Sequence, residues 1–224
     1  MKKLAILALF IAAGLTACGG DGNDEARLKV LHGSPDAPAV DILVDGSTVV
    51  NSLSYGQSTD SLPVDAGSRN IAVNVAGSST TVIGATLPLA ENTGYLIVAS
   101  NRVANIAPIV ATIDGVRPAA GKAKVRVLHG APGAPAVDVY VVAPGDSIAS
   151  LTPVLSGVPF GAISGYLEVP AGTYDVKVTV AGTKTVAIEA LSFSITEGFL
   201  GTVAALDAVG GGAPFSLSVL DERE

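Results

Sequence analysis

Cysteine is almost absent from this chain of 224 residues, in which Cys18 is the only one. No disulfide can form within the chain, so packing alone must stabilise its folded part. Tryptophan is absent and aromatic residues make up only 4% of the chain, whereas valine, threonine, alanine and glycine are abundant. This composition favours strands and turns over helices.

The chain also lacks a cluster of basic residues. Lysine and arginine number 13 against 20 acidic residues, and the net charge is −7. Surfaces that bind nucleic acid need a basic patch to neutralise the phosphates. The composition therefore excludes nucleic acid as a partner.

Long hydrophobic runs are missing as well. The longest covers residues 4–15, and a membrane-spanning helix needs about 20 apolar residues. Two lysines precede this run and small residues separate it from Cys18, an arrangement typical of a cleavable export signal. We therefore predict that residues 1–17 are a signal peptide.

The tetrapeptide Leu15-Thr16-Ala17-Cys18 resembles the lipobox of bacterial lipoproteins at every position. The resemblance implies that Cys18 carries covalent diacylglycerol and an acyl chain after cleavage before it, and no other cofactor is expected. Several acyl chains on one residue give stable anchoring, so the expected partner is a lipid bilayer of the cell envelope. Gly19 resembles the pattern that favours the outer membrane over the inner membrane. The alternative is an ordinary signal peptide whose cysteine is incidental.

The rest of the chain is a tandem repeat. Residues 31–41 and 128–138 are identical at nine of eleven positions, and residues 66–77 match residues 171–182. The offset grows from 97 to 105 between the two matches, so eight extra residues lie around residues 143–159. The repeat and its turn signals predict the following division: a flexible lipidated tether over 18–26, a first domain over 27–114, a linker over 115–121 and a second domain over 122–224.

Hydrophobic residues in both copies recur with a period of two. In residues 174–180, Tyr and Val alternate with Asp175, Lys177 and Thr179, and residues 40–44 and 71–75 alternate in the same way. This period is typical of strands with one buried face. We predict an all-β fold of two tandem antiparallel β-sandwiches, immunoglobulin-like or transthyretin-like, with about seven strands each.

Two apolar side chains fall on strand faces opposite the expected core. These are Leu43 in the first copy and Tyr140 in the second. Packing between the two domains is the favoured interpretation, and a ligand-binding face is the alternative.

The sequence Leu-His-Gly-[Ser/Ala]-Pro-x-Ala-Pro-Ala-Val-Asp occurs in both copies, and a Gly-x-Tyr-x-Val-x-Val strand follows in the second. Together they resemble the domain-of-unknown-function 4397 family, whose members often occur in tandem in exported and surface-attached bacterial proteins. The first copy departs from the pattern at Arg69, where the second has Tyr174. The resemblance implies an envelope β-sandwich and brings no activity or catalytic residues with it.

The only two histidines, His32 and His129, occupy equivalent places in this motif, which ends at Asp41 and Asp138. In one interpretation, each histidine is a metal ligand or a general base paired with the motif aspartate. In the favoured interpretation, a ring nitrogen ties the turn to a backbone carbonyl, because one histidine per domain is too few for a zinc site. The aspartates would bind Ca²⁺, or else solvate their strand face or accept hydrogen bonds from the turn.

No catalytic residue is predicted, because the chain has no Gly-x-Ser-x-Gly element and Cys18 is consumed by lipid. We predict a non-enzymatic structural or binding module of the envelope, whose partner is an envelope protein or a surface polysaccharide. The alternative is a metal-dependent or hydrolytic envelope enzyme that uses the histidine and aspartate of each motif.

Overall fold

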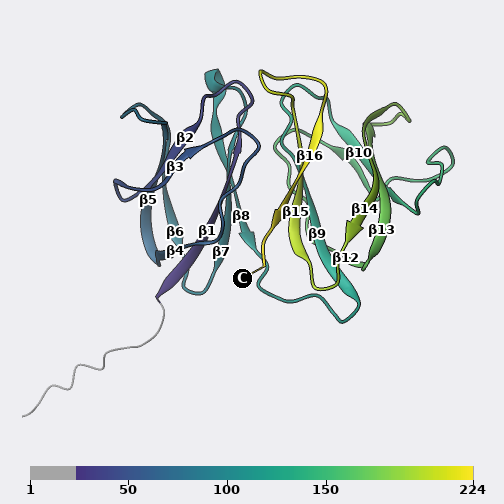
Figure 1. The fold of residues 1–224 in the computed structure, drawn as a ribbon, viewed down its shortest axis with the longest axis horizontal. Helices are drawn as coiled ribbons and strands as arrows, with labels where there is room; N and C mark the ends of the chain where they lie inside the picture. The colour runs from purple at the N-terminus through teal and green to yellow at the C-terminus, as the bar shows by residue number, and fades with distance from the viewer. Residues whose placement is uncertain (1–23, 224) are drawn as a thin grey trace, which may run out of the picture.

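The computed structural model describes residues 24–223, which form two β-sandwiches side by side (Figure 1). The predicted signal peptide and Cys18 lie outside the described residues. Within the described range, no helix is long and apolar enough to cross a membrane. The described residues form sixteen strands and one short 3₁₀ helix: β1 (Glu25–Gly33), β2 (Val40–Val44), β3 (Ser47–Leu53), β4 (Leu62–Asp65), β5 (Gly67–Val75), β6 (Thr81–Leu89), β7 (Gly94–Ser100), η1 (Val103–Asn105), β8 (Ala107–Ile113), β9 (Lys122–His129), β10 (Val137–Val142), β11 (Leu155–Val158), β12 (Leu167–Pro170), β13 (Gly172–Val180), β14 (Val186–Ile195), β15 (Leu200–Leu206) and β16 (Ser216–Asp221).

Each half of the chain builds its own pair of four-stranded sheets. The first copy, β1–β8, has the strand orders β4-β1-β7-β8 and β3-β2-β5-β6, and the second copy, β9–β16, has β12-β9-β15-β16 and β11-β10-β13-β14. The prediction of an all-β fold with two sandwiches is therefore confirmed, with eight strands in each copy rather than seven. One pair in each copy is parallel, β1 with β7 and β9 with β15.

The first strand begins earlier than the sequence predicts. Glu25 and Ala26 pair with Asp65 and Val64 of β4, and Ala26 is fully buried. β1 therefore begins within the stretch assigned to the tether, residues 18–26, and the small Ala26 side chain fits inside the core.

The two copies pack through the sheets that contain β1 and β9, which we call the inner sheets (Figure 1). Residues from both copies form one buried hydrophobic cluster between them: Leu31, Leu96, Val98, Leu128, Ala204, Leu206 and Leu220. The outer sheets, which contain β2 and β10, lie on the far sides. The chain is thus four sheet layers thick.

The prediction that Leu43 and Tyr140 pack between the domains is wrong, because β2 and β10 belong to the outer sheets. Tyr140 is nevertheless buried, against Val142 and Ile148. Ile148 lies in residues 143–154, the loop that contains the eight extra residues expected in the second copy. This insertion covers the outer sheet of the second copy.

The same insertion explains a further difference from the expected alternation. In β5, Ile71 and Val73 are buried as predicted. In β13, however, Asp175 and Thr179 are buried as well as Val178, and Asp175 accepts a hydrogen bond from the backbone N–H of Gly145 in the insertion (2.8 Å). The alternation in β13 predicts that Asp175 and Thr179 face solvent. The insertion covers this face, and its position could not be predicted from the alternation.

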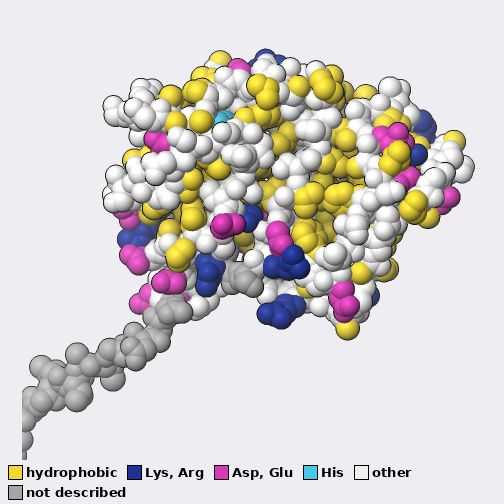
Figure 2. Space-filling view, in the orientation of Figure 1, with side chains coloured by type: hydrophobic (Ala, Val, Ile, Leu, Met, Phe, Trp, Pro, Cys, Tyr) yellow, Lys and Arg dark blue, Asp and Glu magenta, His cyan; other side chains and the backbone are white. Residues whose placement is uncertain are grey.

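The cores of the two copies are unequal. Thirteen buried residues form the core of the first copy, whereas the corresponding cluster of the second has four. Figure 2 shows hydrophobic side chains exposed in a hollow between the two sheets of the second copy.

Candidate functional site

The repeated motif forms the crossing from the inner to the outer sheet of each copy. In the first copy β1 ends at Gly33 and β2 begins at Val40. Pro35 and Pro38 lie between them, and proline lacks the N–H that would continue a sheet ladder. The chain therefore leaves one sheet and enters the other at this point.

The histidine of the motif is buried and both its ring nitrogens are engaged. Nε2 of His32 lies 2.9 Å from the carbonyl oxygen of Pro38, and Nδ1 accepts the backbone N–H of Ser34 at 3.3 Å. Its ring meets Tyr55 edge to face at 6.0 Å. A neutral ring with its proton on Nε2 makes both bonds, and burial lowers the pKa of His32, which favours this form.

The second copy repeats this geometry almost unchanged. Nε2 of His129 lies 2.9 Å from the carbonyl oxygen of Pro135, and Nδ1 accepts the N–H of Ala131 at 3.4 Å. Phe160 takes the place of Tyr55, with ring centroids 6.2 Å apart. Both histidines thus tie the two ends of their own turn together.

The motif aspartates bind backbone groups elsewhere in the outer sheet. Asp41 accepts the N–H groups of Ser52 (2.8 Å) and Gly77 (2.9 Å), which lower its pKa. Asp138 accepts those of Gly157 (2.7 Å) and Gly182 (2.9 Å). Each carboxylate therefore joins the neighbouring edge strand to a hairpin turn.

Ser52 and Gly157 explain why a carboxylate is needed there. Both have positive φ angles, 54° and 62°, and both lie where the pairing register shifts. A bulge of this kind leaves a backbone N–H unpaired in the ladder. The aspartate supplies the missing acceptor.

The structure brings each candidate residue to its turn or bulge rather than to a shared catalytic centre. The ring nitrogens of His32 contact Pro38 and Ser34, and the carboxylate of Asp41 contacts a different pair of groups. No group of three or more His, Cys, Asp or Glu side chains close enough to hold a metal ion occurs within residues 24–223.

One of the two differences between the motif copies has a steric cause. Gly133 replaces Asp36, and a Cβ at Gly133 would lie 2.8 Å from Oδ2 of Asp207 and 2.9 Å from Cα of Gly212. Asp207 accepts the N–H of Gly133. Only glycine fits this approach, whereas Asp36 in the first copy accepts the N–H of Val103 at 2.8 Å.

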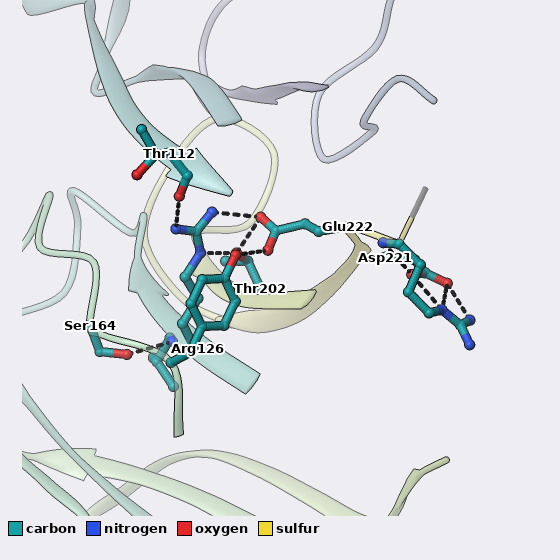
Figure 3. A network of polar contacts seen from close by, with 9 residues as sticks. Thr112, Arg126, Ser164, Thr202, Asp221 and Glu222 are labelled. Atoms are coloured by element: carbon teal, nitrogen blue, oxygen red, sulfur yellow. Dashed lines mark hydrogen bonds and ion pairs between the residues drawn. The ribbon is translucent and has the colours of Figure 1, made fainter. Parts of the chain in front are cut away.

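A polar cluster that the sequence did not predict lies between the two copies. Arg126 and Glu222 form an ion pair (2.7 Å) whose side chains are 4% and 0% exposed. Arg126 also donates to Oγ1 of Thr202 and, across the interface, to the carbonyl oxygen of Thr112 in the first copy, both at 2.8 Å (Figure 3). We call Arg126, Glu222, Thr202 and Tyr166 the interface network.

Tyr166 completes the interface network. Its hydroxyl donates to Oε2 of Glu222 at 2.5 Å, and its ring lies 4.6 Å from the guanidinium carbon of Arg126. Burial and the neighbouring Glu222 carboxylate raise the pKa of Tyr166 far above its usual range. Every charged group in the network therefore has a partner, as buried charges require.

Next to the interface network lies a hollow of about 640 Å³ between the linker and the ends of both copies. Its lining mixes charged and apolar side chains, among them Ile113, Arg117, Glu197, Leu200 and Glu222. Beside it, Lys124 bonds Asp114 at 2.7 Å, and this contact holds the pKa of Asp114 below its usual range. A hollow of this size and mixed lining is suited to a partner that presents both polar and apolar groups.

Comparison with known families agrees with the repeat. Residues 26–140 and 142–224 match the family described as Domain of unknown function (DUF4397). The chain belongs to this family. The first match includes β1–β8 and runs on through the second copy of the motif, and a search of curated proteins found no match.

Proposed function

We propose that this member of the DUF4397 family is a lipid-anchored envelope protein whose two sandwiches act as one rigid, non-enzymatic module that binds another envelope component. The observation that carries the proposal is the use made of the repeated motif. Both nitrogens of each histidine and both oxygens of each aspartate bind the backbone of their own copy. The motif is thus committed to shaping the sandwich.

Contacts along the whole interface support a rigid module. At one end, the hydroxyl of Tyr55 donates to the carbonyl oxygen of Asp207 (2.8 Å), and the N–H of Gly210 to that of Pro35 (2.7 Å). The shared hydrophobic cluster fills the middle, and Arg126 bonds Thr112 at the other end. An interface fixed at three levels restricts rotation of one sandwich against the other.

The proposed anchor places the hollow close to the membrane. Seven peptide units separate Cys18 from Glu25, a reach of at most about 25 Å. β1 begins at the end of the molecule where the chain also finishes, and residues of that end line the hollow (Figure 1). The motif turns would then face away from the bilayer.

Fatty-acid labelling tests the anchor. The wild-type protein should incorporate radioactive palmitate and sediment with membranes, and a Cys18→Ser variant should do neither. Mass spectrometry that finds an unmodified thiol at the amino terminus of the wild-type protein would overturn this half of the proposal.

Site-specific photo-cross-linking tests the binding half. A photoreactive residue at Arg117, in the hollow, should give a discrete product with an envelope protein or a surface polysaccharide. The same residue at Ser78, an exposed hairpin position far from the hollow, serves as the matched control. Equal patterns from both positions would contradict the proposal.

A further inference from the structure

A second cavity lies between the two sheets of the second copy. It has a volume of about 60 Å³, and its lining residues are all apolar. Ten are aliphatic and the eleventh is Phe193. We call this cavity the apolar cleft, and it coincides with the hydrophobic hollow in Figure 2.

The first copy closes the same space. Strand register aligns Leu28, Ile42, Ile71 and Ile97 of the first copy with Val125, Val139, Val176 and Val203 of the cleft. Each replacement removes one methylene group from the second copy. All four residues of the first copy are buried within its core.

Side-chain size explains only part of why the cleft is open, because identical residues at equivalent positions also differ in exposure. Val30 is 1% exposed and Val64 is 8% exposed, whereas their counterparts Val127 and Val169 are half-buried and line the cleft. The space between the two sheets of the second copy is therefore less completely covered around Val127 and Val169.

The insertion accounts for the missing cover. In the first copy, β3 has seven residues and pairs with β2 from Val44 to Val40. In the second copy, the equivalent edge strand β11 has four residues, because residues 143–154 fold over the outer face instead. Val154 and Leu167 are left 49% and 37% exposed at the mouth of the cleft.

The chemistry of the lining selects the occupant. Water held in the cleft would find no hydrogen-bonding partner, and a peptide would bury unpaired backbone groups there. An alkyl chain has no polar group to satisfy. Since one water-sized group needs about 10–15 Å³ of such volume, the cleft holds about four to six methylene groups.

The open mouth of the cleft, where Val154 and Leu167 are exposed, favours an acyl chain as the source of these methylenes. Val125 lies in the middle of β9, where it pairs with Leu167 of β12, and the cleft opens to solvent at this level. A single-chain amphiphile would insert its tail and leave its headgroup in solvent.

We propose that the second copy binds the tail of a fatty acid in the apolar cleft, and that the first copy does not. This proposal does not depend on lipidation of Cys18, so it is tested on the chain from Gly19 onward, which contains every described residue.

The first experiment measures the affinity of saturated fatty acids from hexanoate to dodecanoate by displacement of cis-parinaric acid. Each methylene that enters should strengthen binding about fourfold, the factor that corresponds to burial of one CH₂. The gain should stop after about six methylenes, when the cleft is full. Absence of binding, or affinity independent of chain length, would overturn the proposal.

The decisive variant fills the cleft with the residues of the first copy: Val125→Leu, Val139→Ile, Val176→Ile and Val203→Ile. Its fatty-acid affinity should fall at least about tenfold while its unfolding temperature stays equal or rises. The matched control adds four methylenes at exposed valines outside the cleft: Val49→Leu, Val103→Ile, Val110→Ile and Val219→Ile. Equal binding by the filled and control variants would overturn the proposal.

A second variant guards against misfolding of the filled one. Leu167→Glu places a carboxylate at the partly exposed mouth and should weaken binding of the fatty acid tail without unfolding the chain. Binding to the unlipidated chain but not to the lipidated protein would mean that the chain's own acyl group occupies the cleft, and this outcome contradicts the proposal. So would a dimer, detected by sedimentation, that dissociates when the cleft is filled.

Discussion

The two copies agree most closely where the sequence repeats. The distance from histidine Nε2 to the proline carbonyl oxygen is 2.9 Å in both, and the paired aromatic rings are 6.0 and 6.2 Å apart. Each motif aspartate accepts two backbone N–H groups at equivalent positions. The motif therefore determines how the chain crosses between sheets, and duplication has preserved that geometry.

The copies differ in what surrounds the motif. The first has a closed apolar core, whereas the second has an insertion over its outer sheet, an open cleft and a buried ion pair that faces its neighbour. Strand register places Ile113 of the first copy where the second has Glu222. The second copy thus departs from the first both on its outer sheet and on the side that faces the first copy.

The largest expected effect comes from breaking the interface network, which only the second copy has. Arg126→Met leaves the Glu222 carboxylate buried without its cation, and loss of one partner of a buried pair costs about 3–5 kcal/mol. Urea unfolding followed by circular dichroism measures the change. An effect below about 1 kcal/mol would show that water reaches Glu222.

The double variant Arg126→Met/Glu222→Ile is the control for that prediction. Glu222→Ile gives the second copy the counterpart of Ile113, and replacing a whole buried pair by apolar residues is often neutral. We expect stability close to that of the wild type, with looser coupling between the copies because the bond to Thr112 is lost.

The next effect compares the two cores directly. Leu28→Ala should destabilise the chain by about 3 kcal/mol, because it opens a cavity in a fully buried site. Val125→Ala at the equivalent position should cost about 1 kcal/mol, because Val125 is half-buried beside an existing cleft. Equal losses in thermal unfolding would show that the cleft is closed in solution.

The fold was predictable because its main determinants are local. Alternating valines and isoleucines define the strands, Gly and Asn define the turns, and a nine-of-eleven match defines the duplication. The parallel pairing of β1 with β7 was not predictable, because it joins segments more than sixty residues apart. Neither was the burial of Tyr140, which depends on where the insertion folds.

The candidate site was predictable only in part. The repeat singled out His32, Asp41, His129 and Asp138, and the hydrogen bonds of the two histidines match the favoured interpretation. Arg126 and Glu222 gave no signal, because they are 96 residues apart and lie among ordinary strand residues. The difference between Lys29 and Arg126 at equivalent positions was the one available clue.

A smaller effect separates the two motif aspartates. Asp138 is 5% exposed and its bonds to the N–H groups of Gly157 and Gly182 are partly buried, so Asp138→Ala should cost about 2 kcal/mol in total. Asp41 is more exposed, so water can replace it and Asp41→Ala should cost less. The rates of hydrogen exchange at Gly157 and Ser52 show which N–H group has lost its acceptor. Faster exchange at Ser52 in the Asp138 variant would contradict the pairing of Asp138 with Gly157.

The smallest effect at neutral pH concerns Tyr55, whose counterpart in the second copy is Phe160. Burial raises the pKa of Tyr55 to about 12, whereas an unfolded tyrosine titrates near pH 10. The folded chain therefore keeps a proton that the unfolded chain loses, and stability should fall as the pH rises from about 10 to 12.

Tyr55→Phe makes the aromatic partner of the histidine the same in both copies. At neutral pH it should cost about 1 kcal/mol, from the lost bond to Asp207. Between pH 10 and 12 its stability should fall less steeply with pH than that of the wild type, by up to one proton, and Tyr166, whose pKa is also raised, should contribute to the remaining slope. Identical pH slopes of the unfolding free energy would mean that the pKa of Tyr55 is the same in the folded and unfolded chain. The Tyr55 hydroxyl, which Phe160 lacks, would then have no part in joining the copies.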